Sequence, residues 1–134
     1  MVAFLGPDAA RGQDVVVFAP SLLDVTWAAS ARWHTEVFRI VEFLRGTGGG
    51  EVSIVLTGLP EPRRNGPLER IARRDVQAAN RALRDVARAF DRVDFVPAPA
   101  FTTLRPSGGS FDERYYLGLA DAMVERLVPR LVPR

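Results

Sequence analysis

The chain carries the apolar run Val52-Ser-Ile-Val-Leu56, which ends at the proline-rich segment Thr57-Gly-Leu-Pro-Glu-Pro62. Such a run predicts a strand buried on both faces, because a strand with one face in water alternates apolar and polar residues. The prolines stop the strand, since proline has no N–H group to donate. Val15-Val-Val-Phe18 predicts another strand buried on both faces, and Val93-Asp-Phe-Val96 predicts a short third strand.

Amphipathic segments follow these runs and predict helices over residues 26–45, over residues 67–90 and from Ser110 onward. Gly46 is expected to end the first helix, and Ser110-Phe-Asp-Glu113 has the pattern of a capping box that opens the third. The expected buried faces are Trp33, Val37, Ile40, Val41 and Leu44 in the first helix, Leu68, Ala72, Ala79, Leu83, Val86 and Phe90 in the second, and Leu117, Ala120, Val124 and Leu127 in the third.

This alternation of strands and helices predicts a three-layer α/β/α domain with a mainly parallel sheet, as in flavodoxin-like folds. Residues 2–5 are a candidate further strand. In such folds the ligand and the chemistry lie at the carboxyl ends of the strands. The segments of interest are therefore residues 19–24, 57–66 and 97–112.

The composition bounds the kinds of site that the chain can hold. Its 134 residues suffice for one domain, and 47% apolar with 25% charged residues argues against disorder. The absence of cysteine excludes disulfides and a thiol nucleophile, and a single histidine, His34, excludes a multi-histidine metal site within the chain. We expect no metal and no cofactor.

The sequence also gives expectations about location and ends. No apolar run approaches the roughly 20 residues that span a bilayer, so we expect a cytoplasmic protein without membrane contact. Residues 131–134 repeat the Leu-Val-Pro-Arg of residues 127–130 and resemble the stub of a cleavable tag. The expected domain is therefore residues 1–130.

Several strand-end motifs together resemble the SGNH (GDSL-type) hydrolase family and its PC-esterase branch. Ser21-Leu-Leu-Asp24 follows the first strand where that family has Gly-x-Asn-Asp, and Ile54-Val-Leu-Thr-Gly-Leu-Pro60 resembles its next strand and exit. A long helix containing Asn80 and the short strand at 93–96 are also similar. Asp112-Glu-Arg-Tyr115 lies where the family has Asp-x-x-His. The resemblance covers residues 14–128 and implies a sheet of about five strands.

The departures from the family pattern concern its catalytic groups. No Gly-Asp-Ser block, which carries the family's nucleophile, is present, and Ser21 and Leu23 replace the glycine and asparagine of the oxyanion hole. Asp24 and Asp112 are retained, but Tyr115 replaces the histidine base, and tyrosine is a poor base at neutral pH. The resemblance thus implies a degenerate or incomplete hydrolase domain.

Two functions follow as hypotheses. The first is a non-catalytic binding or assembly module, in which Ser21 and Tyr115 are candidate binding residues. The second is an acyl-ester hydrolase or acyltransferase whose serine comes from a region or chain not present here, with Asp24 and Asp112 as catalytic residues. An incomplete sheet has an exposed edge that invites pairing with another chain. We therefore expect a homo-oligomer or a protein partner.

Other patterns favour ordinary structural roles. Ser30 and His34 lie one helical turn apart, but the third group of a catalytic triad is missing. The glycines of residues 46–50 follow a helix and precede a strand, the reverse of a phosphate-binding loop. Asp24, Asp112 and Glu113 could converge as a cation site, although the latter two already complement a helix dipole.

The last pattern in the sequence is a concentration of arginine in one segment. All 18 basic residues are arginine, and nine of them fall within residues 63–92. The same window contains four carboxylates and Glu61 lies just before it, and Glu69 with Arg73 and Arg81 with Asp85 are spaced for ion pairs. The pattern favours a solvated, charge-laced helix face over a nucleic-acid site, which aromatic residues for base stacking would support.

Overall fold

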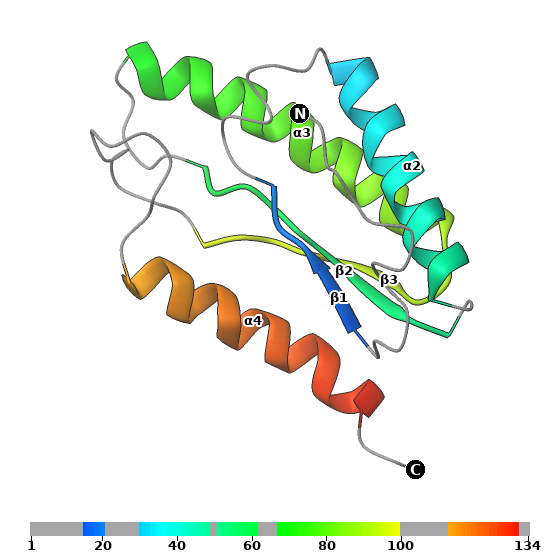
Figure 1. The fold of residues 1–134 in the computed structure, drawn as a ribbon. Coiled ribbons are helices and arrows are strands. Elements are labelled where there is room, and N and C mark those ends of the chain that lie inside the picture. The colour runs from blue at the N-terminus through cyan, green and yellow to red at the C-terminus, as the bar shows by residue number, and fades with distance from the viewer. Residues whose placement is uncertain (1–14, 21–29, 49–50, 62–66, 100–112, 132–134) are drawn as a thin grey trace.

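The computed structural model describes residues 15–20, 30–48, 51–61, 67–99 and 113–131. Their elements alternate along the chain: β1 (Val15–Phe18), α2 (Ser30–Thr47), β2 (Ser53–Thr57), α3 (Pro67–Ala89), β3 (Val93–Val96) and α4 (Glu113–Leu131). Figure 1 shows α2 and α3 along one side of the strands and α4 along the other. The predicted α/β class is confirmed. The candidate strand at residues 2–5 lies outside the described ranges.

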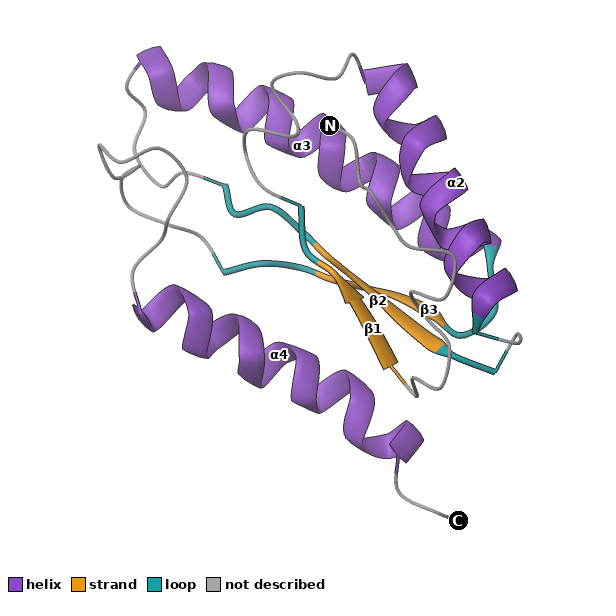
Figure 2. Ribbon diagram, viewed as in Figure 1, coloured by secondary structure: helices purple, strands orange, loops and turns teal. Residues whose placement is uncertain are grey.

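The three described strands form one parallel sheet in the order β1-β2-β3. Figure 2 shows them side by side, with β2 in the middle. Val16 of β1 is in register with Ile54 of β2, and Ile54 is in register with Val93 of β3. The predicted parallel sheet is confirmed, and the first and third strands have the predicted bounds.

Burial differs between the central and outer strands. Every residue of β2 is buried, as its mainly apolar pattern predicts, and the polar Ser53 and Thr57 are buried with the rest. The prediction that Val15–Phe18 is buried on both faces is wrong, since Val17 is 45% exposed. β1 is an outer strand within the described sheet, and an apolar run alone does not distinguish an outer from a central strand.

A core lies between the sheet and helices α2 and α3. The predicted buried face of α2 is confirmed, because Trp33, Val37, Ile40, Val41 and Leu44 are all buried. From α3, Ala79, Leu83 and Val86 join the same core, and Val16 and Phe18 pack against it from β1. Trp33 ties the two helices together, because its Nε1 donates a hydrogen bond to the Ala79 carbonyl at 3.4 Å.

The described part of α4 contradicts the predicted inner face of the third helix. Leu117 is 58% exposed and Val124 is 56% exposed, and Ala120 is exposed as well. Leu119 is the buried position instead, while Leu127 is half-buried. The helix carries apolar residues on two faces, so helical periodicity could not determine which face contacts the sheet.

Helix α2 ends later than expected. Gly46 was expected as the residue after the helix, but it lies inside α2, which continues to Thr47. The Gly48 N–H donates to the Leu44 carbonyl at 2.9 Å. A Cβ at Gly48 would lie 2.6 Å from Val52 Cγ1, so the close approach of the chain to the start of β2 requires glycine there.

No helix in the described ranges is both long and apolar enough to cross a membrane.

Candidate binding groove along strand β3

Most of the residues predicted to form a site are not placed by the structure. Ser21, Asp24 and Asp112 lie outside the described residues. Tyr115 belongs to α4, but only its backbone is described. His34 is exposed on α2 and its ring stacks against Phe38, with 6.5 Å between ring centroids. The side chain of Ser30 lies outside the description, so contact with His34 is not tested.

The exit of β2 is held by the asparagine of α3. Asn80 Oδ1 accepts a hydrogen bond from the Leu59 N–H at 2.7 Å, and Asn80 Nδ2 donates to the Leu59 carbonyl at 2.8 Å. A Cβ added at Gly58 would lie 2.9 Å from Phe95 Cζ and 3.2 Å from Asn80 Oδ1. The exit segment of β2 thus lies close to both Asn80 and Phe95, and a Cβ at residue 58 would force the Phe95 ring to move.

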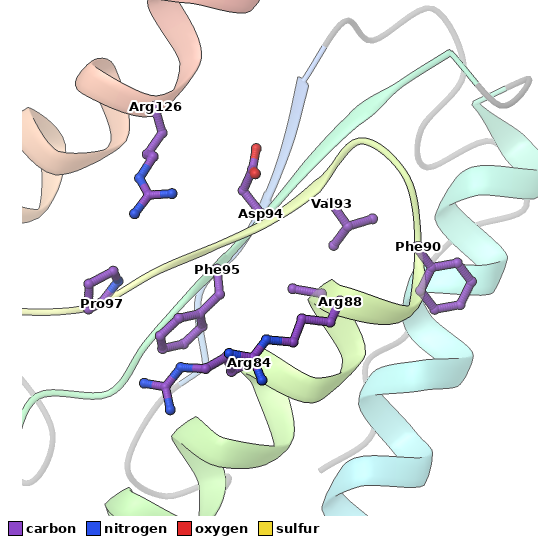
Figure 3. Close-up of a pocket in the computed structure, with 9 residues that line it drawn as sticks. Arg84, Arg88, Phe90, Val93, Asp94, Phe95, Pro97 and Arg126 are labelled. Atoms are coloured by element: carbon purple, nitrogen blue, oxygen red, sulfur yellow. The ribbon is translucent and has the colours of Figure 1, made fainter.

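A groove of about 550 Å³ runs along the outer edge of β3, between α3 and α4. Figure 3 shows the side chains that surround it. Helix α3 and the residue after it contribute one wall, β3 and the proline after it form the floor, and α4 supplies a residue from the opposite side. The lining residues are Arg84, Ala87, Arg88, Phe90, Val93, Asp94, Phe95, Pro97 and Arg126.

The backbone of β3 presents hydrogen-bonding groups to this groove. The Ile54 N–H donates to the Arg92 carbonyl at 2.9 Å, and the Gly58 N–H donates to the Val96 carbonyl at 2.8 Å. In a parallel strand the N–H and C=O groups of one residue point to the same side, and successive residues alternate. Asp94 therefore faces β2 with its main chain, whereas Val93 and Phe95 direct theirs outward, toward the groove.

The side chains give the groove a positive charge. Arg84 and Arg88 reach it from α3, Arg126 reaches it from α4, and Asp94 is the one acidic residue among the lining residues that the structure describes. The guanidinium of Arg84 lies over the Phe95 ring, 5.0 Å from the centroid. This cation–π contact orients one arginine without using its charge in an ion pair. An arginine held in this way can form bidentate hydrogen bonds to a carboxylate.

Sequence reasoning did not find this groove. The arginine pattern predicts a solvated helix face for Arg84 and Arg88, and nothing in the spacing indicates that Arg126, far along the chain, lies near them. One signal was available: only the residues between Ala89 and Val93 connect α3 to β3. Such a short connection places the last turns of α3 beside β3, and hence its arginines beside the strand edge.

Within the described ranges, no three histidine or acidic residues are grouped closely enough to hold a metal ion. The candidate cation site of Asp24, Asp112 and Glu113 involves residues or side chains outside those ranges, so it is not tested.

Comparisons with known proteins add no relative. No family model matches the chain, and neither a curated protein nor a solved structure matches it. The resemblance to SGNH hydrolases therefore remains a prediction from the sequence motifs.

Proposed function

We propose that this chain is a non-catalytic binding and assembly module with SGNH-like topology, and that the groove along β3 binds an anionic segment of a partner protein. One observation carries the proposal: Arg84, Arg88 and Arg126 converge from two helices on a groove in which Asp94 is the single acidic residue among the described lining residues. Converging cations attract a negatively charged partner and orient it during encounter. A cytoplasmic location, as the sequence predicts, suits such a module.

Charge reversal in the groove is expected to weaken the binding of an acidic peptide. The variant R88E/R126E should bind a labelled glutamate-rich octapeptide at least about tenfold more weakly, because each exposed ion pair contributes about 0.2–1 kcal/mol and reversal adds repulsion. Fluorescence anisotropy at two salt concentrations measures the effect. R39E is the matched control, since exposed Arg39 lies on α2 and does not line the groove.

The control decides whether the groove itself is responsible. R39E should leave the dissociation constant unchanged within about twofold. Equal losses in R39E and R88E/R126E would attribute binding to the general charge of the protein, and the groove would lose its proposed role.

A second surface favours assembly with another copy of the chain. Leu117, Val124 and Val128 lie seven and four residues apart on the outward face of α4, and each is 45–58% exposed. This spacing gives the apolar seam of paired helices. Two such stripes match each other in a twofold dimer, because the same patch serves both copies. We propose that the homo-oligomer expected from the sequence forms through this stripe of α4.

The expected dimer is weak and depends on concentration. Fully burying a leucine or valine is worth about 1.5–3 kcal/mol, whereas association costs about 4–15 kcal/mol. Three half-exposed residues on each copy therefore place the dissociation constant above about 10 μM. Sedimentation equilibrium should show dimers of the unaltered chain at high concentration and monomers for L117E/V124E.

A matched variant distinguishes dimerisation through this stripe from nonspecific association of exposed apolar side chains. Phe43 is also an exposed apolar residue, but it lies on α2. F43E should therefore dimerise like the unaltered chain. A monomer at all concentrations, or a dimer that persists in L117E/V124E, would show that α4 is not the interface.

The alternative of an acyl-ester hydrolase or acyltransferase keeps Asp24 and Asp112 as its candidate catalytic residues. Both lie outside the described part of the chain, and the groove along β3 supplies no support for it. The binding module is therefore the function that the described geometry supports best.

A further inference from the structure

We propose that the partner of the β3 groove is an extended acidic segment of another protein, which adds to the sheet as a further strand beside β3. This inference rests on the proposed function and names the partner's conformation and chemistry. It follows from two features that meet in the groove: the edge of β3 that faces away from β2, where no strand of the described ranges pairs with it, and arginines on both sides of that edge.

The strand edge supplies the first feature. Val93 and Phe95 direct their N–H and C=O groups toward the groove, because the flanking residues Arg92 and Val96 accept hydrogen bonds from β2 through their carbonyls. An extended peptide beside such an edge gains main-chain hydrogen bonds without any particular sequence. Pro97 limits the pairing to β3, since proline has no N–H group.

The arginines supply the second feature and define the peptide's chemistry. Successive side chains of a strand point to opposite faces of the sheet. On an added strand, one set would face Arg84 and Arg88 of α3, and the other would face Arg126 of α4 (Figure 3). Acidic side chains on either face of the added strand would therefore lie near an arginine. An isolated phosphate would use the arginines but would leave the outward N–H groups of β3 without a strand partner.

The length of the groove also fits a strand. β3 has four residues, and a strand rises about 3.3 Å per residue, so the edge can pair with roughly four residues of a peptide. A short acidic segment of a larger protein matches this length. The proposed partner is therefore a linear segment rather than a folded surface.

The test uses one glutamate-rich octapeptide and two N-methylated versions of it. Only alternate residues of an added strand donate their N–H groups to β3. Methylating the amides of residues 2, 4 and 6 leaves the alternate set of N–H groups free to pair with β3, whereas methylating the amides of residues 2–7 removes both sets, although all three peptides carry the same charge. We expect the fully methylated version to bind at least about tenfold more weakly and the alternately methylated version to bind within about twofold of the parent.

Amide hydrogen exchange of the full chain provides a second readout. The amide hydrogens of Val93 and Phe95 should become protected when the parent peptide binds, whereas Asp94 and Val96, which face β2, should change little. A folded but non-binding variant, R88E/R126E, should show no added protection.

The outcomes separate this inference from the proposed function. Equal affinity of both methylated peptides, with binding still lost in R88E/R126E, would overturn strand addition but leave the anion-binding groove intact. Failure of every acidic peptide to bind would overturn both. Displacement of the parent peptide by a thymidine octanucleotide at lower concentration than by unlabelled peptide would identify nucleic acid as the better ligand and overturn the acidic partner.

Discussion

Replacing Trp33 by alanine is expected to lower the free energy of unfolding by about 3–5 kcal/mol, the usual cost of removing a large aromatic side chain from a core. Trp33 projects from α2 and is almost completely buried against α3 and β1. The centroid of its ring lies 6.5 Å from that of Phe18. The substitution leaves a cavity where the helices meet the sheet. A loss of this size is a large fraction of the roughly 5–15 kcal/mol that stabilises a typical domain.

Urea denaturation followed by far-ultraviolet circular dichroism measures this effect without relying on the fluorescence of the removed tryptophan. Trp33→Phe is the matched control, because it keeps most of the apolar volume and loses the hydrogen bond to Ala79. We expect the control to lose about 1–2 kcal/mol. If Trp33→Ala lost no more than Trp33→Phe, the packing of Trp33 would contribute little to the core.

The fold was predictable because its signals are local. Short, mainly apolar runs identified all three described strands, and the apolar stripe of α2 identified the residues that are buried on that helix. Each signal needs only a few consecutive residues, and the parallel arrangement follows from the intervening helices. The resemblance to SGNH hydrolases pointed to Asn80, and the structure gives this residue a definite role at the exit of β2.

The groove was not predictable because it depends on contacts between distant segments. Arg84 and Arg126 come from different helices, and no pattern within either helix indicates that both face β3. For α4 the difficulty is different. Leu117 and Leu119 lie on different faces of one helix, and only the packed structure shows which of them contacts the sheet. The face predicted to be buried is therefore largely exposed.

Asn80→Ala is expected to lower the free energy of unfolding by about 2–5 kcal/mol, because it removes the partners of two main-chain groups at once. Leu59 is almost completely buried, and both its N–H and its carbonyl are bonded to the Asn80 side chain. Leaving a buried polar group without a partner costs about 1–3 kcal/mol. Asn80→Asp should be similarly destabilising, since a carboxylate would accept from the N–H but repel the carbonyl oxygen.

Gln77→Ala is the matched control for this prediction. Gln77 lies one turn before Asn80 on α3, is exposed, and makes a single 3.5 Å hydrogen bond to Glu61. Its removal should change the free energy of unfolding by less than about 0.5 kcal/mol. Equal stability of Asn80→Ala and Gln77→Ala in urea denaturation would show that the clamp on Leu59 does not stabilise the fold.

The same substitution links the fold to the groove. Asn80 Oδ1 and the Phe95 ring both lie within 3.2 Å of the position that a Cβ at Gly58 would take, so the clamped exit segment packs next to Phe95. Phe95 in turn orients Arg84 through its ring. Asn80→Ala should therefore weaken binding of the acidic octapeptide several-fold at temperatures where the variant remains folded, although Asn80 does not line the groove. Unchanged affinity in folded Asn80→Ala would show that Phe95 holds its position without the clamp.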